Sequence, residues 1–141
     1  MPYSVRPVSD VQPYIAVVDD EPAVCRAFAR LLRAANFDVR TFGSGASFLS
    51  SLAERRPACV VLDLQLPGIS GFDVQAKLAA NDDNDDAASR EKIPVVIITA
   101  HESAESQQRA MAGGAVAYLK KPVDAEPLFE AIRRVLARDA V

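Results

Sequence analysis

The stretch VVDDEP, residues 17–22, places three carboxylates directly after an apolar run that begins at Tyr14. A short run of β-branched and aromatic residues favours a buried strand. Aspartates that precede a helix commonly cap its N-terminus and complement its dipole, so capping alone would account for Asp19 or Asp20. A second acidic strand end elsewhere in the chain would favour a shared binding site instead.

Short apolar runs alternate with longer segments of helical periodicity along the chain. The runs predict strands at residues 14–18, 38–41, 58–62, 95–99 and 115–119. In the first helix candidate, Val24, Phe28 and Leu31 recur at helical spacing and form an apolar stripe. Further helices are predicted near residues 44–53, 71–80 and 103–112, and a last one starts from Asp124, a candidate N-cap.

Five strands that alternate with five helices predict a parallel sheet covered by helices on both faces. We therefore expect an α/β protein, a flavodoxin-like (βα)5 doubly wound parallel sheet with strand order 2-1-3-4-5. In this order a ligand binds beyond the carboxyl ends of strands one and three, where the strand order reverses. Residues 1–13 contain three prolines and no periodicity, so they are expected to form a leader before one domain at residues 14–139.

Composition excludes several classes of function. The chain of 141 residues carries a net charge of −3 and shows no basic stripe, so we expect no direct binding to nucleic acid or membranes. Its apolar runs are too short to span a bilayer, which favours a soluble, cytoplasmic protein. Cys25 and Cys59 lie in apolar patterns, and two cysteines make no disulfide framework, so both are expected to be reduced packing residues.

Acidic residues follow two strands that the predicted order makes neighbours. Asp19 and Asp20 follow the first strand, and Asp63 follows the third in VVLDL, residues 60–64. Like charges in one place raise one another's pKa, so a bound cation is the natural means of keeping them ionised. Carboxylate oxygens suit Mg²⁺, which commonly binds one or two carboxylates together with a phosphate oxygen. The sequence therefore predicts a Mg²⁺ site that is open to phosphate.

Two further polar residues stand at the ends of the fourth and fifth strands. Thr99 offers a hydroxyl, and Lys121 offers an ammonium on a long side chain. A cation, a hydroxyl and an ammonium around one carboxylate would stabilise charge on a transferring phosphoryl group, with the carboxylate as the nucleophile. Taken singly, Thr99 would fit an ordinary strand position, and Asp63 would fit the opening of a turn before Pro67 and Gly68.

At these positions the chain resembles the receiver domain of two-component response regulators. The resemblance covers residues 14–139 and rests on VVDDEP (17–22), VVLDLQLPGISGFD (60–73), VVIITA (95–100), the glycine pair at 113–114 and AYLKKP (117–122), in the family's order. It implies that Asp63 accepts a phosphoryl group from a sensor histidine kinase or a phosphotransfer protein. It also implies a signalling domain rather than an enzyme, catalysing only its own phosphorylation and dephosphorylation.

The resemblance implies a Mg²⁺ site built from specific residues, with Mn²⁺ as a substitute. Asp20, Asp63 and the backbone carbonyl of Gln65 would bind the ion. Asp19 would complete the acidic pair, largely through metal-bound water.

The resemblance also implies a conformational switch. Thr99 would bind one phosphoryl oxygen and move its loop, while Lys121 would pair with another oxygen. Tyr118 would turn from an exposed to a buried position as Thr99 moves, which would reshape the face made by helix four, strand five and helix five. By analogy with related regulators, this face is expected to form a phosphorylation-dependent homodimer. A cis peptide bond is implied between Lys121 and Pro122, with Lys120 as a solvated neighbour.

Two other functions stay open at this point. A phosphatase of the haloacid dehalogenase type also uses an aspartate nucleophile, but it needs a second aspartate as general acid where Gln65 stands. A receiver-like module would bind partners without accepting phosphate, although the residues for that chemistry are present. A weak similarity of PGISG (67–71) to receivers that precede a LuxR-type helix-turn-helix leaves two arrangements, a single-domain regulator or a receiver cut from a longer one.

Three features need a separate explanation. NDDNDDAASREK, residues 81–92, is longer than the family's usual connection and predicts a flexible acidic loop insertion, with a partner-specific contact as the alternative. His101 is expected to be an exposed loop residue, and the alternative is that His101 and Gln65 control water access to the phosphorylated aspartate. GSGASF, residues 43–48, lacks the third glycine and the lysine of nucleotide-binding loops, so we expect no nucleotide there.

Overall fold

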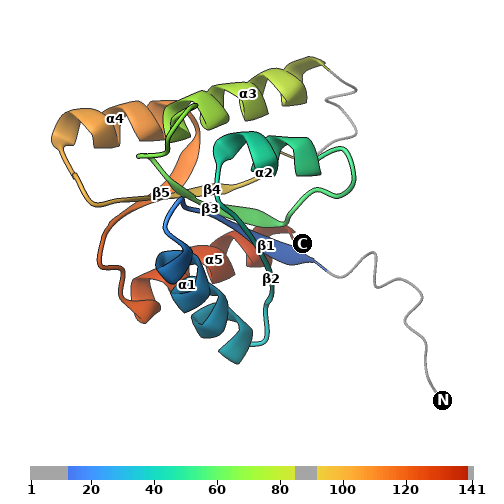
Figure 1. Cartoon of the computed structure of the whole chain (residues 1–141), viewed down its shortest axis with the longest axis vertical. Helices are drawn as coiled ribbons and strands as arrows, with labels where there is room; N and C mark the ends of the chain where they lie inside the picture. The colour runs from blue at the N-terminus through green and yellow to red at the C-terminus, as the bar shows by residue number, and fades with distance from the viewer. Residues whose placement is uncertain (1–12, 85–91, 140–141) are drawn as a thin grey trace.

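The computed structural model describes residues 13–84 and 92–139 (Figure 1). Within these ranges strands and helices alternate in the order β1 (Tyr14–Val18), α1 (Pro22–Ala34), β2 (Asp38–Phe42), α2 (Gly45–Ser51), β3 (Cys59–Asp63), α3 (Gly71–Asn84), β4 (Val95–Thr99), α4 (Ala104–Ala112), β5 (Ala115–Lys120) and α5 (Ala125–Asp139). The predicted leader, apart from Pro13, lies outside the described residues.

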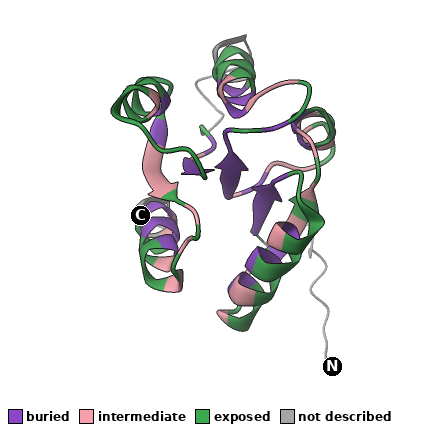
Figure 2. Cartoon of the chain, turned by 60° about the vertical axis from the view of Figure 1, so that its left-hand side comes forward, coloured by how far each residue is buried: buried purple, intermediate pink, exposed green. Residues whose placement is uncertain are grey.

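The sheet has the strand order β2-β1-β3-β4-β5, and every neighbouring pair is parallel. This confirms the predicted flavodoxin-like topology. Helices α2, α3 and α4 cover one face of the sheet, and α1 and α5 cover the other (Figure 1). Because both faces are covered, β1, β3 and β4 are buried along their whole length (Figure 2). Their residues are apolar in continuous runs, not only at alternate positions, except for Asp63 and Thr99 at the carboxyl ends of β3 and β4.

Two apolar clusters fill the space on either side of the sheet. One includes Phe48 from α2 and Leu78 from α3, packed on one face. The other includes Phe28 and Leu32 from α1 and Ile132 from α5, packed on the opposite face. Burial of side chains this size stabilises the fold by about 1.5–3 kcal/mol each. The strands are therefore held from both sides, which fixes the positions of the residues at their ends.

Helix α1 begins at Pro22, a residue suited to a first helical turn, and the chain leaves it through Asn36, whose φ is 73°. Its three arginines, Arg26, Arg30 and Arg33, are all exposed. The expectation that the chain carries no basic stripe is therefore wrong for this helix. The linear sequence does not show this row directly, because apolar core residues separate the arginines, although their spacing places them on one side of the helix.

Element boundaries differ from the sequence prediction by a few residues. Strand β3 starts and ends one residue later than expected, so that Asp63 is its last residue. Helix α3 runs to Asn84, four residues beyond its predicted end near Ala80 and into the predicted acidic insertion. Asparagine and aspartate cost a helix only about 0.7 kcal/mol each, so a polar composition did not mark the end of this one. The rest of the insertion, residues 85–91, lies outside the described residues.

The two cysteines and the lengths of the helices bear on two further expectations. Cys25 and Cys59 are both buried, as expected of packing residues, and they are not joined to each other in a disulfide. No helix within residues 13–84 and 92–139 combines the length and apolar character needed to cross a membrane.

Candidate functional site

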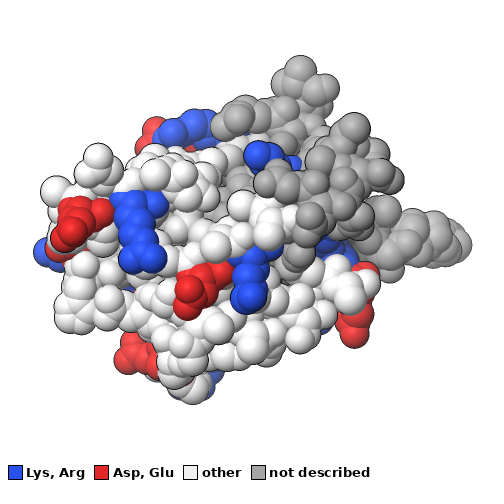
Figure 3. Space-filling model, turned by 90° about the horizontal axis from the view of Figure 1, so that it is seen from above, with Lys and Arg blue, Asp and Glu red and all other residues white. Residues whose placement is uncertain are grey.

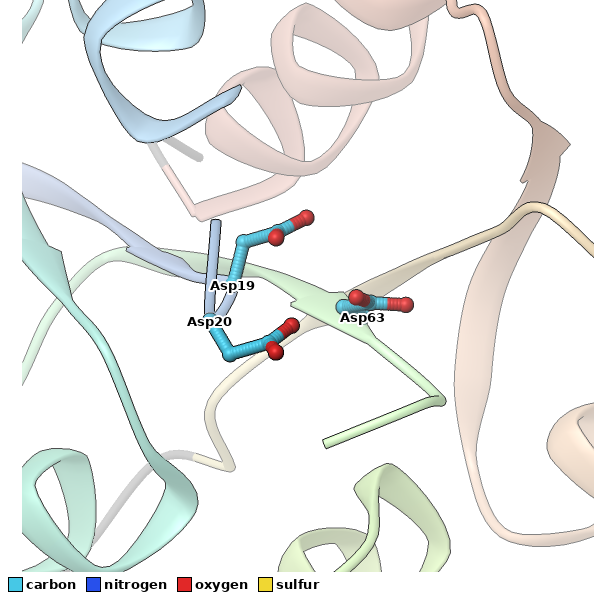
Figure 4. Close-up of side chains that lie close together, drawn as sticks. All are labelled: Asp19, Asp20 and Asp63. Carbon is cyan, nitrogen blue, oxygen red and sulfur yellow. The ribbon is translucent and has the colours of Figure 1, made fainter. Parts of the chain in front are cut away.

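Carboxylates gather where β1 and β3 end side by side at the centre of the sheet. The parallel register pairs Val18 of β1 with Leu62 of β3, and the residues that follow them in sequence are Asp19 and Asp63. Asp20 follows, exposed at the surface. One carboxylate oxygen from each of Asp19, Asp20 and Asp63 lies within 4.8 Å of the others (Figure 4). The structure thus brings together the three acidic residues that the sequence picked out.

Asp19 is fully buried and has partners for both carboxylate oxygens. Its Oδ1 accepts a hydrogen bond from the backbone N–H of Glu21 at 2.9 Å. Its Oδ2 accepts one from Nζ of Lys121 at 2.7 Å. The thiol of Cys25 also donates to the backbone carbonyl of Asp19, with 3.2 Å between Sγ and oxygen. These contacts fix the first carboxylate of the cluster in one orientation.

Asp63 is only 3% exposed. Its Oδ1 accepts a hydrogen bond from the backbone N–H of Gln65 at 3.1 Å, and its Oδ2 lies 3.3 Å from Nζ of Lys121. Burial raises the pKa of the Asp63 carboxyl, and the charge of Asp19 adds to the rise, while the Gln65 N–H and the Lys121 ammonium oppose it. Asp63 is therefore a buried carboxylate that gains from any additional positive charge nearby.

Lys121 connects the two buried carboxylates. Burial alone would lower the pKa of its ammonium, but the hydrogen bond to Asp19 and the charges of Asp63 and Asp19 outweigh burial and raise that pKa. The residue is positioned by a 2.8 Å hydrogen bond from its backbone N–H to the carbonyl of Thr99, and the Lys121–Pro122 peptide bond is cis. Lys120 instead points to solvent, 3.8 Å from the carboxylate of Glu102.

Thr99 ends β4 and is fully buried beside β3. Its Oγ1 accepts a hydrogen bond from the backbone N–H of His101 at 3.1 Å. His101 itself is exposed, as expected, and the contact to Thr99 involves its backbone only. The structure therefore places a hydroxyl at the end of the strand next to the one that carries Asp63.

Tyr118 is half-buried in β5 and reaches the first turn of α4. Its hydroxyl forms a short hydrogen bond with Oγ of Ser106 and accepts a longer one, 3.4 Å, from the backbone N–H of Ser103. In this position Tyr118 connects β5 to the start of α4. Neither serine was singled out from the sequence, because nothing in their spacing indicates that a tyrosine twelve or fifteen residues later would meet them.

The donor set at the sheet end fits a hard divalent cation. Every candidate ligand offers oxygen, and three carboxylates face the single ammonium of Lys121, which leaves an excess of negative charge. Gln65 lies exposed two residues after Asp63, in the loop that leaves β3. Among the described residues, the three members of this cluster are all aspartates, and none offers the sulfur or imidazole ligand that softer metals prefer. The chemistry therefore favours Mg²⁺ over zinc or copper.

Gly71 supports the site in a way that the sequence did not reveal. A Cβ at this position would lie 2.6 Å from the carbonyl oxygen of Asp63 and 2.7 Å from Cα of Leu64. Its backbone N–H donates to the carbonyl of Leu64 at 3.0 Å. Only a residue without a side chain lets the start of α3 approach the end of β3 this closely.

The sequence model of the family described as response regulator receiver domain matches residues 15–133. The chain belongs to this family. Response regulator receivers are domains of two-component signalling, and the fold and the acidic cluster at the ends of β1 and β3 agree with that membership.

Full-length relatives of this receiver are longer than the chain. It is 33% identical over 129 residues to Response regulator protein TmoT of Ectopseudomonas mendocina. The matched segment covers 92% of this chain and 55% of TmoT. It is also 35% identical over 125 residues to Nodulation protein W of Bradyrhizobium diazoefficiens. That matched segment covers 89% of this chain and 52% of the relative. The receiver chain thus spans about half the length of these relatives.

Solved structures show the same architecture. The response regulator StyR superposes with a TM-score of 0.75 at 39% identity, covering 92% of this chain and 61% of StyR. FixJ-N superposes with a TM-score of 0.75 at 30% identity, covering 87% of this chain and 92% of FixJ-N. A CheY-like receiver from Methanospirillum hungatei, at 21% identity and a TM-score of 0.77, covers 89% of this chain and 94% of its own and supports the fold alone.

Proposed function

We propose that Asp63 accepts a phosphoryl group from the histidine of a sensor kinase or a phosphotransfer protein. The observation that carries this proposal is a buried carboxylate 3.3 Å from the Lys121 ammonium, with carboxylate oxygens of Asp19 and Asp20 within 4.8 Å. Such an arrangement offers a nucleophile and, together with a cation, the means to stabilise charge on phosphorus. We place this exchange in the cytoplasm, where such donors act on receivers.

In the proposed transfer, a carboxylate oxygen of Asp63 forms a bond to phosphorus while the bond from phosphorus to the donor's imidazole nitrogen breaks. The imidazole nitrogen keeps the electron pair. Lys121, now shared between Asp19 and Asp63, pairs with a phosphoryl oxygen. Thr99 already accepts an N–H from His101 and donates its own hydroxyl hydrogen to a second phosphoryl oxygen.

We propose that Mg²⁺, with Mn²⁺ as a substitute, is held by Asp19, Asp20, Asp63 and the backbone carbonyl of Gln65. When bound, the ion supplies positive charge that offsets both the carboxylates and the incoming phosphate. The excess of carboxylates over ammonium groups at the sheet end supports this assignment. Without such an ion, like charges would oppose the approach of a phosphoryl group.

The output follows from movement of Thr99 toward the phosphoryl group. Tyr118 then leaves its contacts with Ser103 and Ser106 and turns inward, which reshapes the face formed by α4, β5 and α5. We propose that this face forms a phosphorylation-dependent homodimer or contacts an output partner. The DNA-binding response regulator MtrA of Mycolicibacterium smegmatis is 33% identical over 125 residues, covering 89% of this chain and 51% of MtrA. Any such DNA binding would belong to a further domain or partner rather than to the receiver fold.

Incubation with acetyl phosphate and Mg²⁺ tests the assignment of Asp63. Intact-mass spectrometry should show one added phosphoryl group on the wild-type chain. Asp63→Asn should lose it completely, because an amide is no nucleophile. Asp38→Asn, which changes the charge equally at the exposed amino end of β2, should keep it. Chelation of Mg²⁺ with EDTA should suppress the wild-type reaction.

Three results would contradict the proposal. Phosphoryl label that persists on Asp63→Asn would assign the acceptor elsewhere. Steady turnover of p-nitrophenyl phosphate would favour a phosphatase. A folded wild-type chain that binds no beryllofluoride, an analogue of the phosphoryl group, would favour a module that only binds partners.

A further inference from the structure

Helix α1 carries a row of arginines on its outer surface. The helix contains three of the chain's 16 basic residues and none of its 19 acidic residues. Arg26, Arg30 and Arg33 are spaced by four and three residues, so their side chains leave the helix on the same side. Like charges at these spacings destabilise a helix, so the row opposes the stability of α1 unless something neutralises it.

The row lines a groove between α1 and β2 with a volume of about 630 Å³. Binding sites for small ligands have volumes of about 300–1,000 Å³. Its other lining residues are Ala29, Ala34 and Thr41. The two alanines leave room between the arginines, and Thr41 is exposed. The groove thus offers guanidinium donors around a hollow wide enough for an inserted side chain.

No carboxylate within residues 13–84 and 92–139 lies within ion-pair distance of these three arginines. Arg33 donates to the backbone carbonyl of Val39 at 2.9 Å, so one guanidinium is partly used in the fold. The face seen from above in Figure 3 differs, because acidic and basic side chains lie interspersed on it. The α1–β2 groove is therefore a surface of one sign on an acidic protein.

We propose that the α1–β2 groove binds an acidic segment of a partner protein, whose Asp or Glu side chains pair with Arg26 and Arg30. A guanidinium offers two parallel N–H groups that match a carboxylate. Carboxylates four residues apart on a helix lie about 6 Å from each other, which suits arginines with the same spacing. The net charge of −3 repels long polyanions, and three arginines neutralise few phosphates, so nucleic acid fits less well.

A short helical peptide tests this proposal directly. The probe is a fluorescein-labelled alanine-based peptide with glutamates at positions i, i+4 and i+7, and the reference peptide carries glutamines at those positions. Fluorescence anisotropy at low salt should show binding of the glutamate peptide only, weakening as salt rises. Arg26→Gln with Arg30→Gln should weaken binding by about tenfold or more, as expected when two charge-assisted pairs are lost.

A matched control separates the groove from net charge. Lys77→Gln with Arg109→Gln removes two exposed positive charges from α3 and α4, on the opposite face of the sheet from α1. This variant should keep its affinity within about twofold of wild type, since distant exposed charges are largely screened. Asp63→Asn should also bind as wild type does, so failure of the phosphoacceptor assignment would not affect this test. Equal melting temperatures of the variants would show that the fold is kept.

Four results would overturn the proposal. These are the absence of peptide binding, an equal loss in both double variants, tighter binding of a single-stranded DNA oligonucleotide through Arg26 and Arg30, and tighter binding of phosphatidylglycerol vesicles through the same residues. The last two would assign the groove to nucleic acid or to membranes.

Discussion

Lys121 has a single ammonium group for two buried carboxylates. It lies 2.7 Å from Asp19 and 3.3 Å from Asp63, so neither acidic residue has a cation to itself. Two buried carboxylates that share one ammonium leave a negative charge without full compensation, and an uncompensated buried charge is costly. The site therefore depends on positive charge from outside the chain, which is the reason to expect that divalent cations stabilise it.

The raised pKa of the Asp63 carboxyl predicts how the substitution Asp63→Asn changes the free energy of unfolding at different pH values. The folded chain holds a proton on this carboxyl more tightly than the unfolded chain does. Stability is therefore lost as pH rises from the ordinary aspartate pKa through the raised pKa of the folded state. In EDTA, Asp63→Asn should be more stable than wild type at neutral pH, and the difference should vanish below about pH 4. Urea titrations at several pH values measure this difference.

Asp38→Asn is the control for the change in charge, because Asp38 is exposed and lies at the amino end of β2. Its stability relative to wild type should show no comparable rise with pH. If Asp63→Asn were less stable than wild type at neutral pH, the ionised carboxylate would be stabilising, and the account of an unfavourable buried charge would be wrong.

Site residues could be predicted from the sequence where their place at the end of a strand was enough to bring them together. Asp19, Asp20 and Asp63 stand at ends of strands, so the strand order was enough to expect them together. Contacts that depend on side-chain packing were not predictable. The thiol of Cys25 against the Asp19 carbonyl, for example, follows from how α1 sits on the sheet, and local sequence does not encode that geometry.

In the connection from β3 to α3, Gly71 leaves no room for a side chain. Gly71→Ala would force a Cβ into the backbone of Asp63 and Leu64, at 2.6 and 2.7 Å. We expect a loss of about 1–3 kcal/mol in the free energy of unfolding, as overpacking usually costs. The displaced carbonyl belongs to the proposed acceptor, so phosphorylation by acetyl phosphate should slow as well. Urea denaturation and intact-mass time courses measure the two effects.

Gly43→Ala is the matched control for this substitution, since a Cβ there would meet nothing within 4 Å. It should change stability by less than about 0.5 kcal/mol. Equal effects of the two substitutions would show that loss of glycine flexibility, and not the close approach at Gly71, governs the result.

Helices α3 and α4 are joined by one buried amide. Gln75 is 4% exposed, and its Nε2 donates to the carbonyl of Ala110 in the last turn of α4 at 3.0 Å. Gln75→Met keeps the volume but removes this hydrogen bond, so we expect a loss of about 1 kcal/mol. Amides in the last turn of α4 should then exchange faster with deuterium than in wild type.

Gln108→Met provides the comparison, because Gln108 is exposed on α4 itself. It should leave both stability and exchange close to wild type. Unchanged exchange in Gln75→Met would mean that apolar packing alone holds α4 in place.

The existence and order of the elements could be predicted better than their ends. Continuous apolar runs placed β1 and β4 correctly, because strands buried on both faces are bounded by polar residues. The end of α3 could not be predicted from composition, since the weak helix preference of asparagine and aspartate does not stop a helix already formed. The arginine row on α1 was missed because the linear sequence hides which side of a helix a residue occupies.

For the molecule as a whole, the sheet is asymmetric in exposure. Strand β5 forms one edge, and its residues from Val116 to Leu119 are only half-buried, while the central strands are fully buried. On the neighbouring helix α4, Met111 is 44% exposed. Partly covered apolar surface of this kind is common where a second chain binds. It supports the proposed dimer through α4, β5 and α5.

Sedimentation velocity with beryllofluoride and Mg²⁺ tests that dimer. The wild-type chain should shift from monomer to dimer when the analogue binds, because the α4, β5 and α5 face is expected to change only in the phosphorylated form. Asp63→Asn should stay monomeric under the same conditions, and Asp38→Asn should dimerise as wild type does. A dimer of equal affinity with and without the analogue would separate association from phosphorylation.

The overall topology could be predicted because five strands and five helices in alternation allow few arrangements. Dependence on other molecules could not be predicted in the same way. Whether an exposed face is covered by a partner depends on that partner's surface, which one chain does not encode.

Because Val18 pairs with Leu62, the arrangement of the acidic cluster depends on the number of residues in β3. Deleting one residue from 59–62 would leave every reactive group in the chain, yet it would slide Asp63 by about 3.3 Å and reverse the direction of each side chain between the deletion and the loop. Exchanging Val60 for isoleucine alters no such spacing. Natural variants of this domain should therefore tolerate many replacements in β3 but no change in its length, and insertions should accumulate in connections remote from the carboxyl edge.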